Sequence, residues 1–78
     1  HNHRLSLILN ALNEKDITIM DSIEIIFDRK IGDEQMHFAI GEARAHLIHL
    51  DVTNQAKSKV DERGTVYYSK IWLQRAKI

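Results

Sequence analysis

The sequence contains no cysteine, and this absence excludes a disulfide framework, a thiolate zinc site and a cysteine nucleophile. It also contains no proline, and neither a low-complexity stretch nor an internal repeat is visible. Apolar residues follow one another in runs of only about three, whereas a transmembrane helix needs about 20. No signal peptide is recognisable at the start. We therefore expect a soluble, cytoplasmic protein without a membrane partner, stabilised by packing alone.

An excess of charge of one sign is also lacking, because 11 Lys and Arg balance 11 Asp and Glu over the 78 residues. Residues 1–40 hold four basic and seven acidic side chains, and the remainder holds seven basic and four acidic ones. This weak asymmetry is no basic patch, so the composition offers little attraction to nucleic acid or to acidic partners. With 44% hydrophobic and 28% charged residues, the chain suits one small globular domain.

Hydrophobic periodicity predicts a first helix over about 3–13 and a third, longer one over 34–52. We expect Asp33 to be the N-cap of the long helix and Asn54 to end it in the left-handed conformation. The apolar face of the first helix comprises Leu5, Ile8, Leu9 and Leu12, and that of the long helix Met36, Ala39, Ile40, Ala43, Leu47 and Leu50.

Between these helices, the β-branched segment 17–19 predicts a short strand. Thr18 followed by Asp21 resembles a capping box, with Asp in place of the usual Glu or Gln, and predicts a second helix over about 19–29. Its expected buried stripe comprises Ile19, Ile23, Ile26 and Phe27, and its expected wet side Asp21, Ser22, Glu24 and Asp28.

The period changes from 3.6 to two after residue 56. Residues 56–69 predict a β-hairpin with Gly64 at its tip, and residues 70–78 predict a short final helix. The aromatic residues are few, and we expect Trp72, with Tyr67, Tyr68 and Ile71, to close the core or an interface rather than to stack on bases.

The order helix, short strand, helix, helix, hairpin is that of a winged helix-turn-helix domain of the α+β class, with three helices and a two-stranded wing. Three short motifs make the resemblance more specific: His3-Arg4, Ala45-His46-Leu47, and the basic segment Ala56-Lys57-Ser58-Lys59-Val60 with Tyr67-Tyr68 on its return strand. Over about residues 3–70, the sequence resembles the winged-helix domain C-terminal to the metallo-β-lactamase fold in the branch of hydrolases that includes lactamase-β-like protein 2. Two positions depart from that family, because Asn54 stands where Gly is usual and Ile17-Thr18 where a Pro or a Leu-Thr step is frequent.

The resemblance implies that residues 1–78 form a single winged-helix domain at the C-terminal end of a larger chain, with no catalytic, cofactor-binding or metal-ligating residue of its own. Zinc would belong to the missing catalytic domain, where a His-x-His-x-Asp-His cluster holds two zinc ions. Here His1-Asn2-His3 is followed by Arg4-Leu5, so this cluster is not present. The function implied is that of a non-catalytic accessory domain that shapes substrate access or assembly, partnered by the catalytic domain of the same chain or by a second copy in a homodimer.

Five histidines invite a metal hypothesis, since His46 and His49 lie three residues apart on the predicted long helix. Two ligands do not make a site, and the sequence favours His46 as a partly buried packing residue and His49 as a surface one. The serines and glycines form no nucleophile elbow and no phosphate-binding loop, so the residues themselves predict no enzymatic activity for this segment.

The alternative function is that of a winged-helix DNA-binding transcriptional regulator, in which the long helix would enter the major groove. The residues that would contact nucleic acid or a partner are Arg44, Lys57, Lys59 and Arg63. Opposite the apolar stripe of the helix lie Gln35, Phe38, Glu42, Ala45 and His49, flanked by His37 and Arg44. Because Glu34 and Glu42 would repel phosphates, we expect weak or no binding to nucleic acid, with the choice between DNA and RNA left open.

Overall fold

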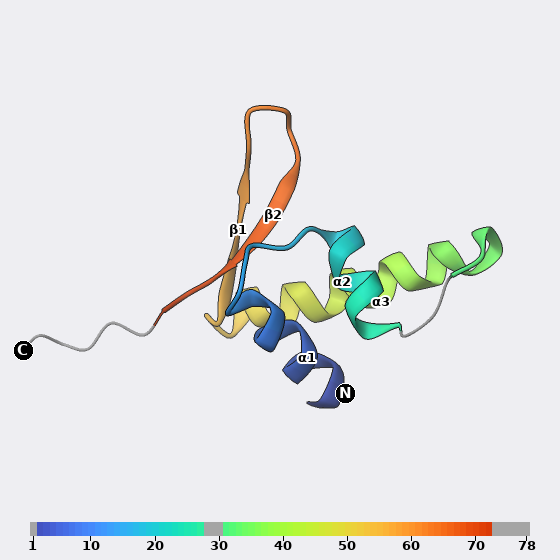
Figure 1. Cartoon of the computed structure of the whole chain (residues 1–78), viewed down its shortest axis with the longest axis horizontal. Helices are drawn as coiled ribbons and strands as arrows, with labels where there is room; N and C mark the ends of the chain where they lie inside the picture. Colours follow the sequence, from blue (N-terminus) through green and yellow to red (C-terminus); the bar gives the residue numbers. More distant parts are fainter. Residues whose placement is uncertain (1, 28–30, 73–78) are drawn as a thin grey trace, which may run out of the picture.

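The computed structural model describes residues 2–27 and 31–72 and has an α+β architecture. Three helices, α1 (Asn2–Leu12), α2 (Ile19–Ile26) and α3 (Asp33–Val52), precede a hairpin of the strands β1 (Ala56–Val60) and β2 (Val66–Lys70). Figure 1 shows the hairpin rising from the C-terminal end of α3, away from the three helices. The predicted order of helices and hairpin is therefore confirmed.

The start of α2 is fixed by the capping box that the sequence predicts. The Asp21 amide donates to Thr18 Oγ1 at 3.0 Å, and the Thr18 amide donates to Asp21 Oδ2 at 3.0 Å. These reciprocal bonds satisfy two backbone donors that the first turn leaves free. The helix ends at Ile26, earlier than predicted, because Phe27 is extended with φ −109° and ψ 107°. The remainder of the predicted helix end, 28–30, lies outside the described residues.

The predicted strand at 17–19 is wrong except for its first residue. Ile17 forms an isolated antiparallel bridge with Tyr68, in which the Ile17 amide donates to the Tyr68 carbonyl at 3.0 Å and the Tyr68 amide donates to the Ile17 carbonyl at 2.7 Å. Thr18 is already the cap of α2 and Ile19 its first residue. The local β propensity of the segment is overridden because a cap fixes Thr18 and the helix buries part of Ile19.

The two ends of α3 differ in how well the sequence predicts them. The predicted N-cap Asp33 is wrong, since Gly32 holds the extended cap conformation without a side-chain bond and Asp33 is the first helical residue. At the other end, Asn54 has the predicted left-handed φ of 62°. The Gln55 amide donates to the Leu50 carbonyl at 2.8 Å and the Asn54 amide to the Asp51 carbonyl at 3.0 Å, which is the Schellman arrangement.

The hairpin is antiparallel, with Val60 paired to Val66 next to the turn and Ala56 paired to Lys70 at the base. Gly64 has a φ of 86°, as its predicted place in the turn requires. Asp61 Oδ1 accepts hydrogen bonds from the amides of Arg63 and Thr65, at 2.8 and 3.0 Å. The predicted helix over 70–78 is not formed where it is described, because Lys70 ends β2 and Ile71 and Trp72 follow without helical structure. Residues 73–78 lie outside the described part.

The core lies between one face of α3, the inner faces of α1 and α2, and the base of the hairpin. Its buried apolar residues are Ile8, Leu12, Ile17, Ile23, Ile26, Ala39, Ala43, Leu47, Leu50 and Ala56. Ser22, which the sequence places on the wet side of α2, is fully buried instead, and its hydroxyl donates to the Ile19 carbonyl at 2.6 Å. The helix can bury this residue because its hydroxyl bonds to the preceding turn. Trp72 is 59% exposed and so does not close the core, while its place in an interface stays a prediction.

Among the described helices, none combines the length and the apolar composition that a membrane span requires.

Candidate functional site

The four basic residues that the sequence singles out lie on three different parts of the fold, and all are exposed. Arg44 is on α3, Lys57 and Lys59 are on β1, and Arg63 is in the hairpin turn. Strand alternation puts Lys57 and Lys59 on one face of the hairpin. The fold therefore brings two of the four together and leaves the other two on separate elements.

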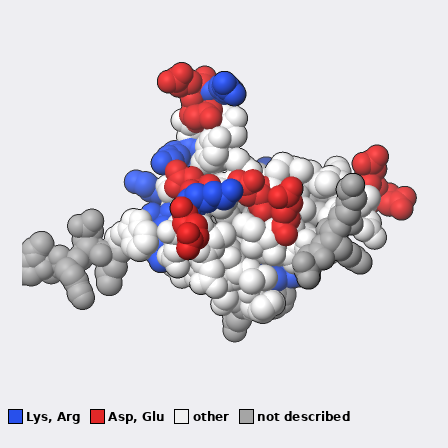
Figure 2. Space-filling view, viewed as in Figure 1, with Lys and Arg blue, Asp and Glu red and all other residues white. Residues whose placement is uncertain are grey.

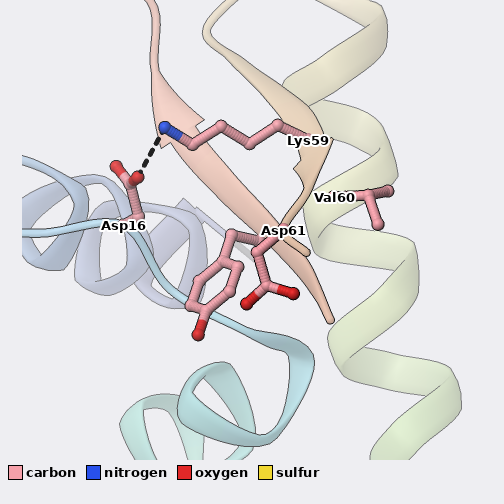
Figure 3. A pocket seen from close by; sticks show the side chains of 5 residues that line it. Asp16, Lys59, Val60 and Asp61 are labelled. Atoms are coloured by element: carbon pink, nitrogen blue, oxygen red, sulfur yellow. Dashed lines mark ion pairs between the residues drawn. The ribbon is translucent and has the colours of Figure 1, made fainter. Parts of the chain in front are cut away.

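Acidic neighbours offset two of these basic residues. Lys59 Nζ lies 2.8 Å from Asp16 Oδ2, in a shallow pocket that Tyr67 and Asp61 also line (Figure 3). Arg63 is flanked by Glu62 in the turn, and Figure 2 shows acidic and basic side chains mixed at the hairpin tip. On the face that Figure 2 displays, the basic side chains are interspersed with acidic ones and do not form a continuous basic surface.

The histidine pair on α3 diverges, as the sequence predicts. His46 is only 8% exposed, and its Nδ1–H donates to the Glu42 carbonyl at 2.6 Å. His49 is exposed on the last turn of the helix. Within residues 2–27 and 31–72, no three His, Cys, Asp or Glu side chains are grouped closely enough to hold a metal ion. The two rings thus serve packing and surface roles in the described fold.

The outward side of α3 is apolar. From the sequence, Phe38 and Ala45 were placed on this side, but an apolar surface was not predicted. We call this side the outer seam, and it comprises Phe38, Gly41, Ala45, Ile48 and Val52, all exposed. Phe38 is 64% exposed, Ile48 45% and Val52 74%. At 100° per residue these positions lie opposite the buried face of Ala39, Ala43 and Leu47. The alternating spacing of three and four residues was the signal in the sequence that could have revealed it.

Charged side chains border the outer seam on both edges. Arg44 and Asp51 lie along one edge, and Glu42 and His49 along the other. Glu42 is tied to α1, because its Oε1 lies 3.4 Å from Arg4 Nη1. The Arg4 guanidinium also lies over the Phe27 ring, 5.1 Å from the ring centre. An apolar stripe with charged edges is typical of a helix that packs on another protein surface.

Comparison with known proteins places this fold. Residues 5–71 match the family described as the metallo-beta-lactamase-like, C-terminal domain. The chain is also similar to the crystal structure of a beta-lactamase domain protein from Burkholderia ambifaria, with a TM-score of 0.85 and 30% sequence identity over 91% of this chain. It spans only 21% of the length of that protein. No curated protein matches the sequence.

The chain therefore belongs to the metallo-β-lactamase-like C-terminal domain family. The matched residues include α1 from residue 5 onward and all of α2, α3, β1 and β2.

Proposed function

We propose that this chain is a non-catalytic, winged-helix accessory domain of a metallo-β-lactamase-fold hydrolase, in which α3 and the hairpin shape substrate access or assembly. The observation that carries this proposal is the family match over residues 5–71, which covers all of α2, α3 and the hairpin. The exposed apolar outer seam supports it, because such a surface is suited to contact with another domain or subunit.

The winged-helix assignment rests on how the elements are arranged. The hairpin follows directly after the long helix α3. Ile17, which precedes α2, forms a one-residue bridge with Tyr68 of β2. A winged helix-turn-helix domain has the same succession of a short extended segment, two helices and a hairpin. This architecture by itself implies no DNA-binding role.

The zinc chemistry of the metallo-β-lactamase fold would belong to a separate catalytic domain. The histidines of α3 do not fit a two-zinc site. His46 is buried with its Nδ1 bonded to a backbone carbonyl, and His49 lies exposed on the last turn of the helix. When bound, paired zinc ions supply a metal-activated hydroxide and polarise the substrate. No residue of this chain is assigned a step in that reaction.

The gene sequence upstream of His1 tests the proposed function directly. We expect a His-x-His-x-Asp-His cluster there, encoded in the same reading frame. Elemental analysis should then find zinc in the purified longer protein and none above background in the purified 78-residue chain. An upstream frame without that cluster, or stoichiometric zinc in the 78-residue chain, would show that the accessory-domain proposal is wrong.

We also propose that this domain binds nucleic acid weakly or not at all. Net charge zero gives little long-range attraction to phosphates, and the Lys59–Asp16 ion pair engages one of the basic residues of the hairpin. Titration with duplex DNA and with single-stranded RNA at about 150 mM salt should give a dissociation constant no tighter than about 10⁻⁴ to 10⁻⁶ M, weakening further as salt is raised. Sequence-dependent binding tighter than about 10⁻⁷ M would contradict this and make Arg44, Lys57 and Lys59 the first residues to substitute.

A further inference from the structure

Between residues 41 and 52, the outer seam of α3 has two small residues followed by two larger ones, and Phe38 lies one turn before this stretch. Gly41 and Ala45 are followed by Ile48 and Val52, at the spacing by which helices form a continuous contact with another helix. A Cβ placed on Gly41 would meet nothing within 4 Å, so the surface above it is open. A helix that packs on residues 41–52 of the seam must therefore place large side chains against Gly41 and Ala45 and small ones against Ile48 and Val52.

A second copy of α3 has this property if the two helices run antiparallel. With the two-fold axis between residues 46 and 47, Ala45 faces Ile48 of the partner subunit and Gly41 faces Val52 of the partner subunit. Each layer then combines one small and one larger side chain. A parallel pair would instead place Gly41 against its own copy and Ile48 against its own copy, which leaves one layer empty and crowds another.

The charged edges of the seam are complementary in the same antiparallel register. Arg44 faces Asp51 of the partner subunit along one edge, and the two-fold axis produces this contact twice. Along the other edge, Glu42, whose carboxylate is paired with Arg4 of its own chain, faces His49 of the partner subunit, so the charge complementarity rests on Arg44 and Asp51. The parallel pair brings Arg44 beside His49 of the partner subunit and offers it no carboxylate.

We propose that two copies of this chain associate through the outer seam, with their α3 helices packed antiparallel and Arg44 paired to Asp51 across the interface. A second copy of the chain would then be the partner in the assembly role proposed above. The dimer rests on that proposed function only for its biological use. The overlapping segment, 41–52, is about 18 Å long. A contact of this length lies toward the small end of specific interfaces, so we expect a weak, concentration-dependent dimer.

Two single charge reversals and their mixture test the proposal on the 78-residue chain. In the self-pair of Arg44→Asp, two carboxylates face each other at both contacts, and in that of Asp51→Arg two guanidinium groups do. Each variant alone should self-associate at least about tenfold more weakly than the wild-type chain in sedimentation equilibrium. An equimolar mixture of the two should form a heterodimer, because both contacts in the mixed pair combine opposite charges.

Matched controls separate the seam from general effects of charge and exposure. Arg63→Asp makes the same charge change in the hairpin turn and should leave the self-association of the chain unchanged. Val52→Glu should weaken it at least about tenfold, whereas Val60→Glu, at an exposed valine of β1, should not. Circular dichroism of every variant checks that the fold is retained.

On the 78-residue chain, three results would overturn the proposed dimer: a wild-type chain that stays monomeric at about 1 mM, single reversals that dimerise like the wild type, or a mixture that stays monomeric. In the longer protein, a seam covered by the catalytic domain of the same chain would leave the oligomeric state unaffected by Arg44→Asp, and this outcome also rejects the proposal. The upstream gene sequence and the zinc content are independent of these measurements, so the dimer can fail while the accessory-domain function stands.

Discussion

Leu47→Ala should remove a large share of the stability of this domain. Leu47 is fully buried where α3 faces the other helices, and truncating a buried leucine costs about 2–5 kcal/mol through lost burial and the cavity left behind. A chain of 78 residues has a total free energy of unfolding of only about 4–12 kcal/mol. We therefore expect urea denaturation to show a much lower midpoint, and the melting temperature to fall by about 4–8 °C for each kcal/mol lost.

Met20→Ala is the matched control for this cavity, because Met20 is 52% exposed on α2 and lies outside the outer seam. Its effect on the free energy of unfolding should stay below about 1 kcal/mol. Equal losses for the two variants would show that Leu47 does not hold the central place in the core that its burial indicates.

Ile17→Ala should loosen the attachment of the hairpin to the helices as well as the core. Ile17 is fully buried and is the residue whose backbone bridges Tyr68 on β2. Truncating a buried isoleucine costs about 2–5 kcal/mol. Hydrogen exchange should show the extra effect locally, with faster exchange of the Tyr68 amide that donates to Ile17 at 2.7 Å.

Val60→Ala serves as the control in the same hairpin, since Val60 is 64% exposed next to the turn. Its effect on the free energy of unfolding should be within about 0.5 kcal/mol, with the exchange of the Tyr68 amide unchanged. If Ile17→Ala left both the stability and this exchange rate at wild-type values, the hairpin would have to be anchored elsewhere.

Features that depend on near neighbours in the chain were predictable from the sequence. The capping box of Thr18 and Asp21, the left-handed Asn54 and the glycine turn at Gly64 each involve residues within a few positions of one another. The core stripe of α3 was also predictable, because burial on one side of a long helix repeats every three or four residues. For the same reason His46 could be placed inside and His49 outside.

Two of the errors arose where packing between separate elements competes with a local preference. Segment 17–19 has strand-forming residues, but only Ile17 finds a partner strand, at Tyr68. Ser22 is polar, yet it is buried because its hydroxyl bonds back to Ile19 while α2 packs against α3. For the candidate site, the four basic residues are exposed and their role as contacts stays a prediction, while Asp16, which pairs with Lys59, is far away in the sequence.

By itself, the sequence determined the class of the fold, the order of the three helices and the hairpin, and most of their boundaries, because periodicity, caps and turns are local properties of the chain. Only the tertiary structure decided which apolar residues remain on the surface. Phe38, Ile48 and Val52 have the hydrophobicity of core residues, and they are exposed because α1, α2 and the hairpin base cover the other side of α3. A helix can bury only the side that other elements reach, so the outer seam became evident once those elements were placed.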